Sequence, residues 1–260
     1  MSDGHQGDMG GPVQVEAAGG MVTLWLDRPE RGNALGPALV EALDAGIDAA
    51  LARGARLIVL RGRGRNFCTG LDLADLDAVS EGDLALRIIR IELLLQKISG
   101  LPVTTMAVAG GRVFGAGADL FAACDRRLAL TGSSFSFPGP AFGLVLGTGR
   151  VAGLVGDTAA RRLLLEGAPI DAGMALALGL ATAQPGEEEV PEAIAAAGRA
   201  AARLDAETVA ALHGRTRRAE NAADLAALAR SVARPGLKRR IQDYRARSAA
   251  SRAPKTGSPA

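Results

Sequence analysis

Short apolar runs alternate with longer stretches of helical spacing along the first part of the chain. The short runs predict strands at 13–16, 21–26, 56–60, 103–109 and 126–130. The first two strands flank Gly19-Gly20, which predicts a hairpin. Apolar residues recur at helical spacing over 83–98 and over 37–52, where Gly36-Pro37 is a favourable helix start. Strands that alternate with helices indicate a fold of the α/β class.

The pattern changes toward the C-terminus. From about Thr148 onward only helical spacing is found, and Pro185-Gly186 and Arg234-Pro235-Gly236 interrupt it. We therefore expect an α/β core over 12–185 and a helical region over 186–246. The ends, 1–11 and 247–260, are predicted to be disordered tails.

One segment combines glycines with a candidate acid. Four glycines lie within 110–117, directly after the strand predicted at 103–109. Glycine permits backbone shapes that other residues resist and lets a ligand come close. A helix that begins near Ala116 leaves its first N–H groups unpaired, and Asp119 lies on the same helical face. Backbone donors with a carboxylate one turn away suit a reaction that forms an oxyanion and moves a proton.

A second segment has the same character. The β-rich run 57–60 ends in a glycine-marked loop that leads to Phe67-Cys68-Thr69-Gly70-Leu71-Asp72-Leu73. We predict a strand, a loop and a helix start in this order, as in the first segment.

Together the two segments resemble the crotonase superfamily, the enoyl-CoA hydratases and isomerases. The resemblance covers most of the chain. Leu26-Asp27-Arg28-Pro29 through Asn33-Ala34-Leu35 is similar to an early CoA-contacting loop of the family. Residues 67–73 and 110–125 are similar to its two oxyanion motifs, and residues 156–180 to a late helical stretch. It implies an α/β spiral of stacked ββα units followed by a C-terminal α-helical trimerisation domain. The implied assembly is a trimer or a dimer of trimers.

The resemblance also implies roles for single residues. The backbone N–H groups of Leu71 and Ala116 are implied to form the oxyanion hole that holds a thioester carbonyl as it becomes an enolate. Asp119 stands where many hydratases of the family carry their first catalytic glutamate. The implied CoA contacts are Arg28, Arg31, Gly32, Cys68, Gly70, Leu71, Asp72 and Leu73. The implied substrate pocket comprises Phe114, Gly115, Pro138, Gly139 and Phe142. No metal is implied, and no cofactor beyond the CoA moiety of the substrate.

The second glutamate of the family pattern is missing. That pattern reads Pro-Glu, whereas this chain has Pro138-Gly139, and the following loop at 144–150 contains no replacement acid. Hydration in this family uses two carboxylates, so we expect an activity that resembles an isomerase more than a standard hydratase. A catalytically silent acyl-CoA binding protein is the alternative. A nucleotide-binding or structural oligomer is a third reading, supported only by Gly62-Arg63-Gly64 after a strand.

Composition narrows the class of protein further. The net charge of +2 indicates no nucleic-acid partner. The two cysteines, Cys68 and Cys124, suggest neither a disulfide scaffold nor a metal site, and we expect buried thiols. His5 and His213 are predicted at the surface. No signal peptide is recognised, and no apolar run reaches the ~20 residues of a membrane span. We expect a cytoplasmic protein without a membrane partner.

Overall fold

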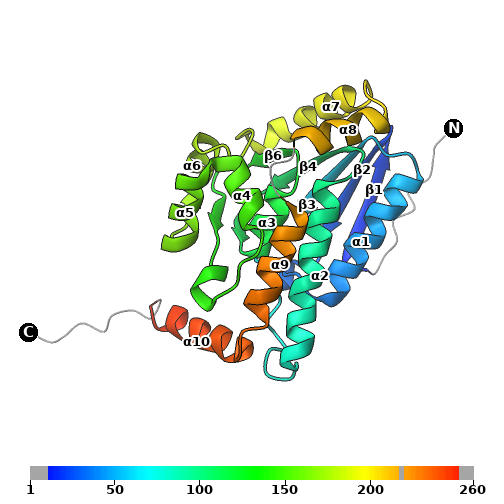
Figure 1. The fold of residues 1–260 in the computed structure, drawn as a ribbon. Helices are drawn as coiled ribbons and strands as arrows, with labels where there is room; N and C mark the ends of the chain where they lie inside the picture. The colour runs from blue at the N-terminus through cyan, green and yellow to red at the C-terminus, as the bar shows by residue number, and fades with distance from the viewer. Residues whose placement is uncertain (1–10, 217–219, 252–260) are drawn as a thin grey trace, which may run out of the picture.

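The computed structural model describes residues 11–216 and 220–251, and two sheets form its framework (Figure 1). The strands are β1 (Val13–Ala18), β2 (Met21–Leu26), β3 (Leu57–Gly62), β4 (Thr104–Ala109), β5 (Arg112–Phe114), β6 (Arg126–Ala129), β7 (Ser134–Ser136) and β8 (Ile170–Asp171). The larger sheet has the order β1-β2-β3-β4-β6 and is parallel except for the β1–β2 hairpin. The smaller sheet has the order β5-β7-β8, with β5 parallel and β8 antiparallel to β7.

Helices cover both faces of the larger sheet. They are α1 (Pro37–Ala52), α2 (Glu81–Ser99), α3 (Ala116–Ala122), α4 (Thr148–Val155), α5 (Asp157–Glu166), α6 (Ala172–Ala177), α7 (Val190–Ala201), α8 (Ala206–Thr216), α9 (Asn221–Val232) and α10 (Leu237–Ala250), with 3-10 turns η1 (Pro29–Arg31), η2 (Gly139–Phe142) and η3 (Glu187–Glu189). Within the ranges that the structure describes, none of these helices is long and apolar enough to cross a bilayer.

The alternation of side chains on β3 shows how the two faces are used. Ile58 and Leu60 point into the main core, where they join buried residues of α1, α2 and α3. Leu57 and Val59 belong to a second cluster on the opposite face, together with buried residues of α7. Successive residues of a strand face opposite sides, so a strand covered on both faces is apolar at every position.

Most predicted elements are confirmed. The hairpin around Gly19-Gly20 forms, α1 has the predicted bounds, and β3, β4, β6 and α2 lie within two residues of their predicted positions. Both cysteines are free and buried, as expected.

Three expectations are wrong. The stretch after Thr148 is not wholly helical, because β8 pairs with β7 and Ala183 forms a bridge with Leu128. No helix begins at Leu71, which instead forms a bridge with Leu35, and turns fill the chain up to α2. The C-terminal tail does not begin at 247: α10 continues to Ala250 through residues that favour helices. The rest of the two predicted tails, 1–10 and 252–260, lies outside the described residues.

His213, predicted at the surface, is half-buried and attaches α8 to the core. Its Nδ1 lies 2.8 Å from the Leu101 carbonyl oxygen, and its Nε2 lies 3.1 Å from Oδ1 of Asp125. Burial raises the pKa of Asp125, but the hydrogen bonds from His213 and Thr105 outweigh burial and leave that pKa below its usual value. The histidine is therefore structural, and it lies on the helix that follows α7.

Candidate active site

The two glycine-rich segments lie side by side and are joined through their backbones. Phe67 N–H donates to Gly110 O at 2.8 Å, and Phe114 N–H donates to Cys68 O at 3.0 Å. A Cβ atom at Gly117 would overlap the Cys68 backbone, and a Cβ at Gly70 would lie 2.7 Å from Phe114 O. Only glycine allows this close approach, which explains why glycines recur in both segments.

The structure brings the two predicted oxyanion donors to neighbouring positions. Gly70 lies close enough that a Cβ there would be 3.5 Å from the Ala116 nitrogen, and Leu71 follows it directly. Ala116 is the first residue of α3, so its N–H has no partner within the helix. In the described part of the chain, neither this N–H nor that of Leu71 donates to another backbone group. Two free donors close together are what an oxyanion hole needs.

Asp119 lies in the first turn of α3, three residues after Ala116. It is 4% exposed, and its Oδ1 has no hydrogen-bond partner among the described residues. Burial raises the pKa of Asp119 well above its usual value, against the opposing effect of Arg150, and the charges of Glu92 and Asp224 raise it further. A carboxyl group with a raised pKa keeps its proton to higher pH than an exposed aspartate, which suits a group that accepts and returns a proton.

The residues that surround Asp119 were not among the predicted site residues. Glu92 on α2 is fully buried and forms an ion pair with Arg150 on α4, whose side chain is 6% exposed. Asp224 comes from α9 and lies next to Gly149. Glu92 interrupts the apolar face of α2 between Ile91 and Leu94, and a charge in such a stripe is a signal that the sequence offered.

Gly139, where the resemblance implies the second glutamate, carries no side chain. It begins η2, and a Cβ atom there would meet Leu144 at an ordinary contact distance of 3.7 Å. The space therefore admits a side chain, but this chain supplies none. The carboxyl groups whose charges act on Asp119 come instead from α2 and α9, as Glu92 and Asp224.

Some of the residues predicted to line the substrate pocket lie close to one another, whereas Phe142 faces a different part of the structure. Pro138 lies beside Gly115, whose added Cβ would be 3.8 Å from the proline ring. Phe142 packs against Tyr244 of α10 with ring centroids 5.1 Å apart. It also lines a surface pocket of about 320 Å³ whose walls include Arg234 and Arg247. Phe142 therefore faces α10, where no pocket was predicted from the sequence.

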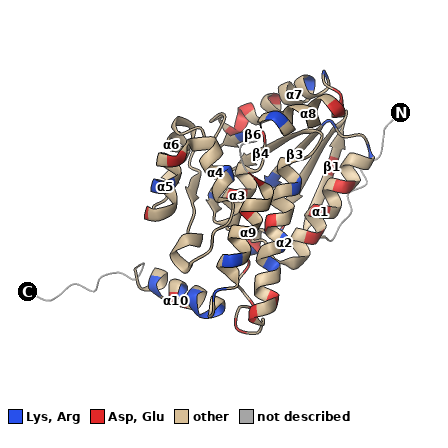
Figure 2. Cartoon of the chain, in the orientation of Figure 1, with Lys and Arg blue, Asp and Glu red and all other residues tan. Residues whose placement is uncertain are grey.

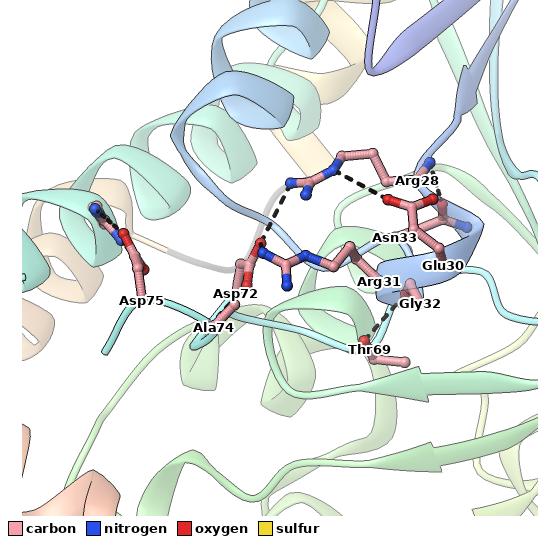
Figure 3. A network of polar contacts seen from close by, with 10 residues as sticks. Arg28, Glu30, Arg31, Gly32, Asn33, Thr69, Asp72, Ala74 and Asp75 are labelled. Carbon is pink, nitrogen blue, oxygen red and sulfur yellow. Dashed lines mark hydrogen bonds and ion pairs between the residues drawn. The ribbon is translucent and has the colours of Figure 1, made fainter. Parts of the chain in front are cut away.

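Polar contacts involve four of the predicted CoA-contacting residues, Arg28, Arg31, Gly32 and Asp72 (Figure 3). Arg28 Nη1 lies 3.3 Å from Oδ2 of Asp72, and Arg31 Nη2 lies 4.0 Å from the same oxygen. Gly32 O accepts hydrogen bonds from both the backbone N–H and the hydroxyl of Thr69. The early loop and the first oxyanion segment are thereby held together, and the exposed Arg31 is available to an anionic ligand.

Cys68 contributes to the site through its backbone. The residue has no exposed surface, and burial raises the pKa of its thiol to about 12. The thiol is therefore neutral and unreactive, whereas the Cys68 carbonyl accepts the hydrogen bond that joins the two loops.

Helix α10 supports the loop after Leu73 from the outside. Lys and Arg are frequent along this helix (Figure 2). Lys238 Nζ donates to the carbonyls of Asp77 and Val79, and Arg245 Nη1 donates to that of Leu73. Gln242 donates to Oδ1 of Asp77. The basic C-terminal helix thus contacts the segment predicted to touch CoA within the same chain.

Known proteins share this architecture. The family described as enoyl-CoA hydratase/isomerase matches residues 16–233. A probable enoyl-CoA hydratase, echA6, from Mycobacterium tuberculosis is 37% identical over 174 residues, which cover 66% of this chain and 68% of the relative. An enoyl-CoA isomerase/hydratase, fer4, from Mycosarcoma maydis is 30% identical over 174 residues, which cover 62% of this chain and 64% of that protein.

A solved structure from Bordetella parapertussis, provisionally described as an enoyl-CoA hydratase/isomerase, is 46% identical to the chain. Its TM-score is 0.89, with 91% of this chain and 99% of that one covered. The fold is thus that of the crotonase superfamily. Within it, the chain belongs to the enoyl-CoA hydratase/isomerase family.

Proposed function

We propose that the protein acts on an acyl-CoA thioester through an enolate held by the backbone N–H groups of Leu71 and Ala116, and that it moves a double bond rather than adding water. Asp119 is the base that removes a proton next to the carbonyl and returns it at another carbon. The observation that carries this proposal is a buried, unpartnered carboxyl oxygen in the first turn of α3, the helix whose first N–H is one of two free backbone donors. Such donors are worth roughly 10²–10³ in rate each.

Gly139 favours a double-bond shift over hydration. Adding water requires groups that hold and deprotonate the water, and no side chain is present at this position. Moving a double bond requires one base that accepts and returns a proton, which Asp119 alone provides. A raised pKa makes the conjugate acid of Asp119 available for the second half of that step.

A turnover assay tests this proposal. The purified chain is given a 3-enoyl-CoA and, separately, a 2-enoyl-CoA, and the absorbance of the conjugated thioester is followed. We expect conjugation of the 3-enoyl substrate and little hydration of the 2-enoyl substrate. Fast hydration of the 2-enoyl substrate would contradict the proposal.

Binding provides a second, independent test. The exposed Arg31 is only loosely paired with Asp72, and we expect it to contact a CoA phosphate. Replacing Arg31 with alanine is expected to weaken acyl-CoA binding about tenfold, because a hydrogen bond to a charged group contributes ~1.5 kcal/mol or more. Calorimetric titration measures this, with Arg53→Ala, another exposed arginine, as the matched control.

The same titration compares an acyl-CoA with the matching free fatty acid. We expect the thioester to bind far more tightly, and equal affinity for the two would contradict the acyl-CoA reading.

A silent acyl-CoA binding protein is the second candidate, and the empty acid position at Gly139 favours it. Tight acyl-CoA binding with no turnover of either enoyl substrate would identify this alternative. The trimer or dimer of trimers and the cytoplasmic location implied above stay predictions.

A further inference from the structure

Four charged side chains from four different helices meet at the start of α4. They are Glu92 of α2, Asp119 of α3, Arg150 of α4 and Asp224 of α9. A Cβ atom at Gly147, which precedes α4, would overlap the Asp119 carboxyl group. The lack of a side chain at this position therefore makes room for the candidate base.

Asp224 lies against the same backbone segment. A Cβ atom at Gly149 would be 2.6 Å from Oδ1 of Asp224, so the carboxyl group lies directly on this backbone. Gly147 and Gly149 are separated by one residue, and a backbone segment of this length spans at most about 7 Å. The carboxyl groups of Asp119 and Asp224 thus flank one short stretch of chain.

Arg150, the residue after Gly149, uses only part of its guanidinium group in its ion pair with Glu92. Its Nη2 donates to Glu92, whose other oxygen accepts from Gln96. Its Nε and Nη1 are buried and have no partner among the described residues, and the same holds for one oxygen each of Asp119 and Asp224. Buried polar groups are nearly always hydrogen-bonded, so two spare donors and two spare acceptors in one cluster call for a functional explanation.

The charges of this cluster do not balance. Three carboxyl groups share one guanidinium, and the ion pair with Glu92 already takes up the positive charge. Burial raises the pKa of Asp224, and the positive charge of Arg150 opposes this rise. The negative charges of Glu92 and of Glu220, just before α9, raise the pKa of Asp224 further. Two carboxyl groups in such a place ionise as a coupled pair, because each negative charge disfavours the other.

We propose that Asp224 is a positioning residue for Asp119, which titrates with it as a coupled pair beside Arg150 and keeps a proton available to Asp119 near neutral pH. The proposal rests on the role of Asp119 in the proposed function. In this proposal a second carboxyl group near Asp119 comes from α9, since Gly139 has no side chain. Asp224 does not take that group's place: it acts on the base and touches no substrate.

Carbon NMR of the full chain labelled at the aspartate carboxyl carbons tests the coupling without any turnover. The Asp119 signal is assigned by its loss in Asp119→Asn. In Asp224→Asn, which removes a negative neighbour, we expect the Asp119 signal to titrate at lower pH than in the wild type. Asp157→Asn, a change at an exposed aspartate of α5, is the control and is expected to leave the midpoint unchanged.

Asp224→Glu separates charge from packing. It restores the negative charge, so we expect the midpoint of Asp119 to return toward the wild-type value. An unchanged midpoint in a folded Asp224→Asn protein overturns the proposal, as does a shift that Asp224→Glu fails to reverse. Circular dichroism and the melting temperature establish that each variant is folded.

Kinetics tests the link to the reaction. The acidic limb of the kcat/KM profile for a 3-enoyl-CoA is expected to move to lower pH in Asp224→Asn, in parallel with the NMR midpoint. A shift by NMR in a protein without turnover supports the coupling and rejects the proposed function. If Asp224→Asn turns over the substrate and neither the acidic limb of its kcat/KM profile nor the NMR midpoint moves, the coupling is rejected and the proposed function is retained.

Discussion

Replacing Asp119 with asparagine is expected to slow turnover of a 3-enoyl-CoA by roughly 10²–10⁴, the usual contribution of a positioned acid–base group. Asparagine keeps the size of the side chain, so the packing next to Gly147 is retained while the proton acceptor is lost. The measurement is kcat from the absorbance of the conjugated thioester. Because the donors of Leu71 and Ala116 stay in place, we expect acyl-CoA affinity to change little.

The control for this experiment is Asp157→Asn, which removes an exposed carboxylate from α5. It is expected to retain wild-type turnover. A variant of Asp119 that keeps its turnover would show that the base lies elsewhere, and a variant that loses acyl-CoA affinity as well would point to a structural role for this carboxyl group.

Breaking the buried pair of Glu92 and Arg150 is expected to have the largest effect on stability. The side chains are 0% and 6% exposed, so removing one charge leaves the other buried without compensation. We expect Glu92→Leu and Arg150→Met each to lower the free energy of unfolding by about 3–5 kcal/mol. The urea midpoint and the melting temperature, measured at one protein concentration, report the change.

The double variant Glu92→Leu with Arg150→Met is the informative comparison. It replaces the pair with apolar side chains, and such replacements are often neutral or stabilising. We therefore expect the double variant to be more stable than either single variant. If the loss in free energy of unfolding in the double variant equalled the sum of the losses in the two single variants, the two side chains would act independently. That result would contradict a buried ion pair.

Local signals were sufficient for most of the fold. The hairpin at Gly19-Gly20, the start of α1 at Pro37 and the strand before each glycine loop depend on residues close in sequence, and all of them form. The misplaced helix start at Leu71 shows the limit of such signals. There, the Asp72 side chain accepts a hydrogen bond from Ala74 N–H and holds a turn.

Two features that could not be predicted from the sequence, strand β8 and the buried charge cluster, depend on contacts between residues far apart in the chain. The two-residue strand β8 is too short for a pattern and exists because β7 lies beside it. The cluster of Glu92, Arg150 and Asp224 joins helices distant in the chain, so no spacing rule brings these residues together. That the two glycine-rich segments lie side by side was implied by the family resemblance, which supplied what spacing alone does not.

The way in which the two glycine-rich loops are joined makes the positions of their N–H groups independent of the side chains around them. Backbone hydrogen bonds and glycine contacts fix the donors, as between Phe114 N–H and Cys68 O. Side chains that face the acyl group can therefore change without displacing the donors. If Phe114 faces the acyl group, as the proposed function implies, its replacement changes which acyl chains fit while the N–H groups of Leu71 and Ala116 stay in place.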